Sequence, residues 1–173
     1  VAKDVKAQLE FNPNQVVEYR QIGYENRQLA REDFNNDKVD AGDIGAGKRV
    51  TVLYELVLKG SKGEVKADPL RYQNEKPKSD SGRELAFLKM RWKTPAGSKS
   101  ELASLAINTP DQLAAFTDGS VDMRFTVAVA AFGQKLRHNG ALDKTSWQTI
   151  LDWADKAKGR DEHGYRQEFV GMV

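Results

Sequence analysis

DFNNDKVDAGDIGAGKRVTVLYELVL, residues 33–58, joins the most irregular pattern of the chain to its most regular one. The first half is polar and rich in glycine, which is typical of a loop. The second half alternates, so that its apolar side chains share one face of an extended chain. These side chains are Val50, Val52, Tyr54, Leu56 and Leu58. The pattern predicts a strand over residues 49–58, at the centre of a sheet and preceded by a loop.

The composition is ordinary for a soluble globular protein and excludes several classes of function. The chain has 173 residues, and 27 Lys and Arg against 25 Asp and Glu give a net charge of +2. Such a small, scattered charge gives no reason to expect nucleic acid as a partner. No apolar run approaches the roughly 20 residues that cross a bilayer, so we expect no membrane insertion by this chain. The absence of cysteine excludes disulfides, thiolate nucleophiles and cysteine-ligated zinc.

Alternating segments elsewhere predict four more strands. They are expected at residues 5–11, 15–22, 84–92 and 100–107. In the first of them, Lys6 lies on the polar side of a half-buried strand. Asn12-Pro13-Asn14 (12–14) follows it and is compatible with a hairpin or with a step between sheets. Residues 60–83, rich in Gly, Pro and charged side chains, are expected to be the least structured segment.

The second part of the chain changes to helical periodicity. Helices are predicted at residues 113–116, 121–138, 146–158 and 164–173. Ser120 is the expected N-cap of the second, and Thr145 with Gln148 forms a capping box for the third.

Apolar spacing predicts which helical side chains are buried. The stripe of the longest helix is Phe125, Val129, Phe132 and Leu136. In the next helix we expect Trp147 in the core, and Trp153 in contact with another layer or a partner.

The order of these elements predicts an α+β fold. An antiparallel, β-sandwich-like layer over residues 1–108 is followed by about three helices over residues 109–173. We expect the helical segment to pack on the β layer, within one structural domain. Because the chain enters a strand almost at its first residue, without an initiator Met, we interpret it as a piece of a longer protein.

The glycine-rich part of the loop resembles a phosphate-binding motif only in part. GDIGAGK (42–48) matches the first seven positions of that motif, but Arg49 replaces the Ser or Thr that would bind magnesium. A phosphate-binding loop also opens a helix, whereas a strand is predicted here. The pattern favours a glycine-rich turn, and we predict no cofactor.

The acidic part of the loop has some features of a calcium site. Asp33, Asn35 and Asp37 occupy positions 1, 3 and 5 of an EF-hand-like loop. Lys38 stands where that loop requires glycine, and position 12 is an isoleucine. A glycine inserted after Asp37 would bring Asp43 to position 12. The candidate metal ligands of a calcium-stabilised loop 33–43 are therefore Asp33, Asn35, Asp37 and Asp43. The other interpretation is a loop whose Asx side chains cap backbone amides.

No residue is predicted to be catalytic. His138 and His163 are 25 residues apart without a ligand-spaced partner, and we expect both at the surface. Neither a G-x-S-x-G nor an H-E-x-x-H pattern is present. An enzyme of unknown type, with its site in loop 33–43, is kept as a minor alternative.

A set of short stretches marks a family resemblance. In the first part these are FNP (11–13), EYRQIGYENR (18–27), LAREDFNND (29–37) and DAGDIGAG (40–47). In the second part they are RF (124–125), AVAAFG (128–133), LR (136–137) and GYR (164–166). With these stretches the chain resembles the C-terminal domain of bacterial von Willebrand factor type A (VWA) domain-containing proteins. The likeness covers nearly the whole chain, and is least clear at residues 60–83.

The resemblance implies a non-enzymatic accessory domain that follows a VWA domain, with a role in protein binding or scaffolding. The implied protein is exported or anchored in the cell envelope, often as a lipoprotein, and its implied partners are its own VWA domain and another envelope protein. The metal-binding motif of VWA domains, Asp-x-Ser-x-Ser, belongs to the preceding domain. The nearest match here, DGSVD (118–122), ends in Asp. No metal-site residue is therefore carried over.

Overall fold

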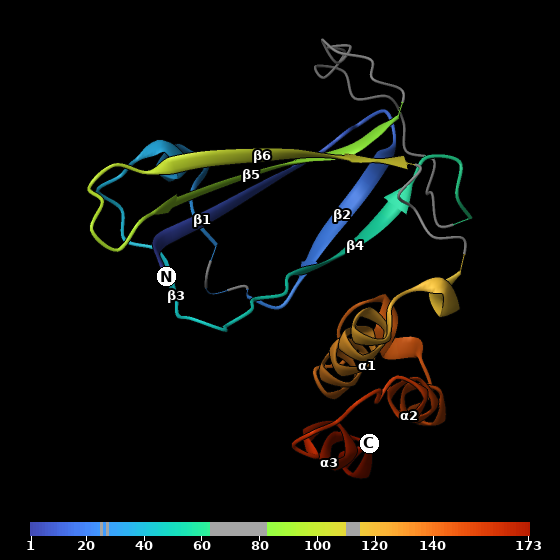
Figure 1. Cartoon of the computed structure of the whole chain (residues 1–173). Coiled ribbons are helices and arrows are strands. Elements are labelled where there is room, and N and C mark those ends of the chain that lie inside the picture. Colours follow the sequence, from blue (N-terminus) through green and yellow to red (C-terminus); the bar gives the residue numbers. More distant parts are fainter. Residues whose placement is uncertain (25, 27, 63–82, 110–114) are drawn as a thin grey trace. The chain divides into compact units, whose positions relative to one another are not determined.

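The computed structural model describes residues 1–24, 26, 28–62, 83–109 and 115–173. The described residues have the α+β fold that the sequence predicts, with two antiparallel sheets followed by three α-helices (Figure 1). They divide into two compact units, Val1–Gln112 with the strands and Leu113–Val173 with the helices. The packing of the helical segment on the β-rich part stays a prediction.

The larger sheet has four strands in the order β3-β1-β5-β6. The strands are β1 (Ala2–Phe11), β3 (Gly42–Ile44), β5 (Glu84–Lys93) and β6 (Glu101–Asn108). Each neighbouring pair is antiparallel. The long strands β1 and β5 occupy the centre, and the three-residue β3 and the longer β6 form the two edges.

The smaller sheet pairs β2 (Val16–Ile22) with β4 (Leu53–Leu58). Residues 12–14 therefore form a step between sheets, not a hairpin. Asn12 holds this step, because its backbone N–H donates to the carbonyl of Leu85 (2.9 Å) and its side-chain amide donates to the carbonyl of Glu84 (2.7 Å). Its side-chain oxygen accepts from the N–H of Asn14 (3.0 Å), which closes an Asx turn.

The prediction of a central strand over residues 49–58 is wrong in two respects. The strand begins at Leu53, and β4 belongs to the two-stranded sheet. Val50 and Val52, which share the alternation, are exposed. The physical reason is the partner strand: the ladder of β2 ends with Ile22 opposite Leu53, so no β2 residue lies opposite residues 49–52. Alternation of apolar side chains indicates which residues could share one face, but a strand also requires a neighbouring strand with which its backbone forms hydrogen bonds.

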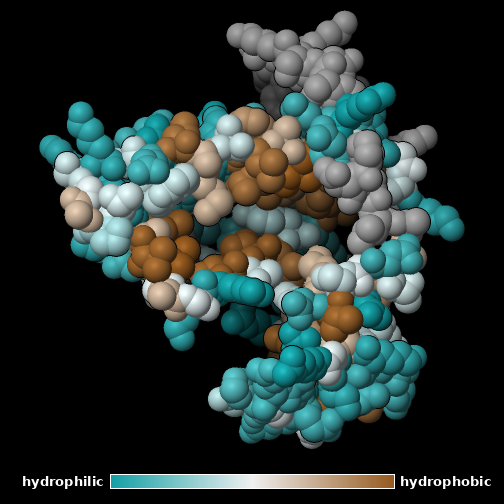
Figure 2. All heavy atoms as spheres, in the orientation of Figure 1, coloured by the Kyte–Doolittle hydropathy of each residue, from teal (hydrophilic) through white to brown (hydrophobic). Residues whose placement is uncertain are grey.

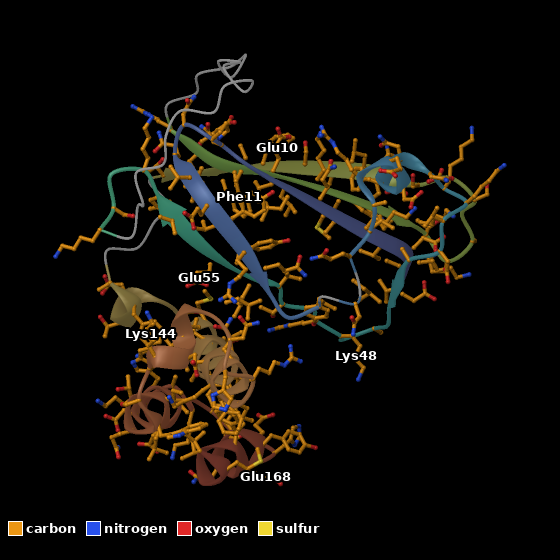
Figure 3. All side chains as sticks on the ribbon, turned by 180° about the vertical axis from the view of Figure 1, so that it is seen from behind. Glu10, Phe11, Lys48, Glu55, Lys144 and Glu168 are labelled. Atoms are coloured by element: carbon orange, nitrogen blue, oxygen red, sulfur yellow. The ribbon has the colours of Figure 1, made fainter. Side chains whose placement is uncertain are left out.

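The two sheets meet at the end of β1. The ring of Phe11 lies 4.7 Å from that of Tyr19 on β2 and 5.3 Å from that of Tyr54 on β4, measured between centroids. From this corner the sheets diverge (Figure 1). Phe11 and Glu10 point to opposite faces of β1 (Figure 3), so Phe11 marks the face of the larger sheet that is directed toward β2 and β4.

The helical unit consists of three α-helices and two short 3-10 segments among its described residues. The α-helices are α1 (Val121–Leu136), α2 (Trp147–Lys156) and α3 (Tyr165–Met172). The 3-10 segments are η4 (Phe116–Asp118) and η5 (Ala141–Lys144). Residues 113–114 of the predicted helix 113–116 and most of the predicted irregular segment 60–83 lie outside the described residues, and Phe116 is the first residue of η4. None of the described helices has the length and apolar character needed to cross a bilayer.

Small residues form the centre of the helical core. Ala128 on α1 and Ala154 on α2 are fully buried and pack with Phe169 of α3. The predicted stripe of α1 is therefore wrong at Val129 and Leu136, which are exposed. Alanines let helices approach closely, so the line of contact runs along the alanine positions instead of the larger aliphatic ones.

The start of α2 also differs from the prediction. The Oγ of Ser120 caps α1 as expected, accepting from the N–H of Met123 (3.2 Å). In α2 the cap is Ser146, which accepts from the N–H of Thr149 (3.1 Å), so the predicted capping box of Thr145 is wrong.

The two tryptophans of α2 exchange the roles that the sequence predicts. Trp147 is the first residue of the helix and is exposed, with its ring in contact with the ring of Phe132 and with Lys135 Nζ, 5.3 Å from the ring centroid. Trp153 packs against the helical core and against Phe116, whose ring centroid is 4.8 Å away.

Candidate functional site

The loop singled out in the sequence is fastened to the larger sheet by two lysine side chains. We call residues 31–47 the anchored loop; it begins with the 3-10 segment η2 (Arg31–Asn35). Lys6 of β1 is 5% exposed, and its Nζ donates to the carbonyls of Asp33 (3.2 Å) and Asn36 (2.6 Å). Beside it, the buried Phe34 ring lies 5.6 Å below the guanidinium of Arg91 on β5. A cation and an aromatic ring thus fix the start of the loop.

The second lysine acts at a bulge in β1. Asp4 has a φ of 50°, and the register of β1 with both neighbours shifts there. Its carboxylate accepts from Lys93 Nζ (2.6 Å) and from the N–H of Ala41 (3.2 Å). Lys93 Nζ also donates to the carbonyl of Asp37 (2.8 Å), and the N–H of Asp4 donates to Asp43 Oδ1 (3.2 Å). The bulge thereby aims one acidic side chain at both the loop and β5.

The charged forms of these groups are stabilised in the folded chain. The hydrogen bond from Lys93 lowers the pKa of Asp4 below its ordinary value of 3.8, and the same bond raises the pKa of Lys93 above 10.5. Hydrogen bonding to Ser100 is the main reason that the pKa of Asp37 is lowered. Ser100 in turn accepts from Arg91 Nη1 (2.9 Å), so the strand end and the loop share one polar network.

This network uses the carboxylates of Asp37 and Asp43, two of the four candidate calcium ligands. The carbonyl of Asp33 is bound by Lys6, and the carboxylates of Asp37 and Asp43 accept from backbone N–H groups of Ser100 (3.4 Å) and Asp4. Asn35 is exposed. Among the residues that the structure describes, no three acidic or histidine side chains come close enough to hold a metal ion. The geometry does not favour the calcium-stabilised alternative, because lysine ammonium groups supply the positive charge.

The glycine-rich stretch 42–48 is a turn only in its second half, because residues 42–44 form the edge strand β3, which the sequence did not predict. Residues 45–48 are closed by a hydrogen bond from the N–H of Lys48 to the carbonyl of Gly45 (3.2 Å), and Gly47 has a φ of 71°. No helix starts at Lys48, which is exposed (Figure 3). The arrangement lacks the helix N-terminus that binds phosphate.

The other distinctive feature is the face of the larger sheet that carries Phe11, which we call the inner face. The strand registers place ten apolar side chains on it. They are Ala7, Leu9, Phe11, Ala86, Leu88, Met90, Trp92, Ala103, Leu105 and Ile107. The prediction that Ala86, Leu88, Met90 and Trp92 share one face of their strand is confirmed.

The inner face is only partly covered by the described residues of its unit. Ala86, at the end where the two-stranded sheet meets β1, is buried, but Leu88 and Met90 are half-buried and Leu105 is 61% exposed. Figure 2 shows hydrophobic residues gathered beside β5 and β6, on the side directed toward β2 and β4. The opposite, outer face carries Lys6 and Arg91 and is where η2 packs.

The burial of Lys6 is the main feature that sequence reasoning missed. A lysine in an alternating strand is ordinarily solvated, and its partners are 27 and 30 residues away in the chain. No local pattern indicates this burial, because the acceptors are backbone carbonyls, which every residue has.

The described residues thus define an α+β domain with an apolar sheet face and an internally neutralised acidic loop, without a converged set of catalytic side chains. A family model described as "Uncharacterized protein YfbK, C-terminal" matches residues 1–173, and the chain belongs to this family. "Uncharacterized protein YfbK" of Escherichia coli (strain K12) is 55% identical over 179 residues. That alignment covers 100% of this chain and 29% of the E. coli protein. No solved structure matches the chain.

Replacing Lys6 with methionine tests the first anchor. Lys6→Met keeps the aliphatic stem but removes the ammonium hydrogen bonds to the carbonyls of Asp33 and Asn36, each of which keeps a backbone donor, the N–H of Asn36 and of Val39. We expect the free energy of unfolding of the β-rich unit to fall by about 1.5–3 kcal/mol, the usual contribution of hydrogen bonds to a charged group. Urea denaturation measures this free energy of unfolding. Lys3→Met, at an exposed lysine of the same strand, is the matched control and should change stability by less than about 0.5 kcal/mol. Equal effects of the two substitutions would contradict this role of Lys6.

The second anchor predicts a dependence of stability on pH. The lowered pKa of Asp4 means that its contribution is present above 3.8 and is lost as the pH falls through the folded-state value. The raised pKa of Lys93 means that its contribution is present below 10.5 and is lost as the pH rises through the folded-state value. Urea midpoints should therefore decline at both ends of the range. Asp4→Asn should flatten the acid limb and Lys93→Met the alkaline limb; unchanged limbs would show that the pair contributes nothing.

Proposed function

We propose that this chain is a non-enzymatic binding domain, an accessory part of a longer protein, which docks through its inner face on a preceding domain of the same polypeptide. The observation that carries the proposal is the incompletely covered apolar inner face. A sheet with one apolar face is stable when that face is buried against another layer. Apolar patches rimmed by polar residues on a folded domain mark interaction surfaces.

The length of the related protein supports this choice of occupant. The chain covers 29% of the E. coli protein, so most of that protein lies outside the matched part, and the family description places the match at the C-terminus. A domain that is joined covalently to its partner binds at a high effective concentration, so a modest apolar surface is sufficient.

The resemblance of the sequence to VWA-associated domains supplies the identity of the proposed partner. We infer that the preceding domain is a VWA domain and that the whole protein acts in the cell envelope, where a second envelope protein is its ligand. The outer face and the anchored loop then provide a rigid, charged surface for that ligand. Fractionation of cells that locates the full-length protein outside the envelope would contradict this part of the proposal.

The non-enzymatic character of the domain is supported by how its polar groups are used. Lys6, Lys93, Asp4 and Asp37 all bond to the backbone or to each other within the fold. Groups that hold a loop in place in this way are not directed toward a substrate.

Two leucines on β6 provide a matched test of docking. Leu105 lies on the inner face opposite Leu88, and Leu102 lies on the outer face opposite Arg91; they are 61% and 53% exposed. Leu105→Asp places a charge in the proposed interface, where an unpaired carboxylate is strongly unfavourable. We expect it to weaken binding of this chain to the separately produced preceding part by about tenfold or more, equivalent to about 1.4 kcal/mol.

Isothermal titration calorimetry measures the dissociation constants of the two leucine variants for the preceding part of the protein. Leu102→Asp, with the same chemistry on the same strand, should leave the affinity within a factor of about two, because surface substitutions outside an interface have small effects. Circular dichroism verifies that both variants are folded. The absence of binding, or equal losses in the two variants, would overturn docking through the inner face.

A further inference from the structure

β6 is an edge strand whose outer side has no partner among the described strands. It is the last strand in the order β3-β1-β5-β6 (Figure 1). Just beyond it, the N–H of Thr109 donates to the carbonyl of Arg83 (2.6 Å), on the side of β5. Because backbone direction alternates along a strand, the odd-numbered positions of β6 bond to β5 and positions 102, 104 and 106 direct their N–H and C=O groups outward.

The other described edges have features that oppose pairing with a further strand, and β6 does not. β3 is only three residues long and contains Gly42 and Asp43. β2 carries Glu18 and Arg20, and β4 carries Glu55. The eight residues of β6, ELASLAIN, include one charge, at the first position, and neither proline nor lysine. Short length, charge and proline are the means by which edge strands avoid association.

We propose that β6 pairs edge to edge with β6 of a second copy of this chain, forming a continuous eight-stranded sheet about a two-fold axis at Ser104. In this antiparallel register Ser104 lies opposite its own copy, and Leu102 lies opposite Ala106. All three outward-directed positions are then matched, which is the self-complementarity that an isologous contact requires. The inference does not rest on the proposed function, because it uses the backbone edge and not the inner face.

Charge and side-chain size favour a second copy as the occupant. Glu101 lies opposite Ile107 in this register, so no like charges meet along the strand. On the inner face Ala103 lies opposite Leu105, which joins the apolar faces of the two copies into one surface. Apolar cross-strand pairs stabilise such an edge. The net charge of +2 adds little long-range repulsion between copies.

Substitutions that introduce a charge at Ser104, on the proposed two-fold axis, test the proposal. Sedimentation velocity of the chain should show a concentration-dependent dimer. Ser104→Lys and Ser104→Glu should each raise the dissociation constant of the dimer about fivefold or more, because like charges directly opposite each other destabilise strand pairing. A mixture of the two variants should dimerise at least as well as the unmodified chain. Ser104→Ala is the control that keeps the backbone and should leave the dimer unchanged.

The absence of cysteine from the chain permits a second, independent measurement. In a hydrogen-bonded pair the facing Cα atoms are about 5.5 Å apart, within the range of a disulfide. Ser104→Cys should therefore oxidise to a covalent dimer. Leu102→Cys should not, because its two copies are separated by about 14 Å along the strands in this register. A monomer at every soluble concentration, a dimer insensitive to charge at 104, or equal cross-linking at both positions would overturn the proposal.

Discussion

The ammonium group of Lys6 is the interaction on which the β-rich unit depends. A lysine that is 5% exposed is costly unless its charge is compensated, and here two backbone carbonyls of the anchored loop accept its hydrogen bonds. The same carbonyls also accept hydrogen bonds from the N–H groups of Asn36 and Val39, so the ammonium group joins the turns of the loop to β1. Lys93 repeats the device at the bulge of β1, with the carboxylate of Asp4 as counter-ion. Two side-chain cations thus do inside the fold what a bound cation does in a metal-binding loop.

This arrangement also determines which parts of the larger sheet are covered by other residues of the unit. The anchored loop packs on part of the outer face through Phe34 and Lys6, whereas Leu102 on the same face is 53% exposed. The apolar inner face meets the two-stranded sheet only at the corner where the rings of Phe11, Tyr19 and Tyr54 join. The described residues of the β-rich unit consequently have few fully buried apolar side chains. A unit with so small a core gains stability by placing its apolar face against another surface, and its fold and its proposed binding role share one physical cause.

The sequence predicts those features that depend on local pattern, and misses those that depend on a distant partner. The faces of β5 and the Ser120 cap follow from spacing and from one hydroxyl next to one N–H. The start of β4 does not, since the alternation at Val50 and Val52 continues beyond the end of the available ladder. The burial of Lys6 is not visible either, because an isolated strand pattern has no means of indicating that carbonyls about 30 residues later need a donor. In α1 the spacing of the larger apolar side chains does not show that the contact with the other helices runs along the alanines.

The alternation of β6 keeps its two possible roles physically separate. Odd-numbered side chains such as Leu105 lie on the inner face, whereas the outward backbone groups belong to even-numbered residues such as Ser104. A substitution at Ser104 therefore leaves the inner face unchanged, whereas a substitution at Leu105 changes the inner face and also the cross-strand pair with Ala103 of the second copy. If both surfaces are used, a sheet extended across the two-fold axis presents two inner faces side by side, and each can bind its own preceding domain. Docking and self-association are then compatible, because docking covers the inner face and self-association uses the outward backbone hydrogen bonds, with Leu105 at the border of both surfaces.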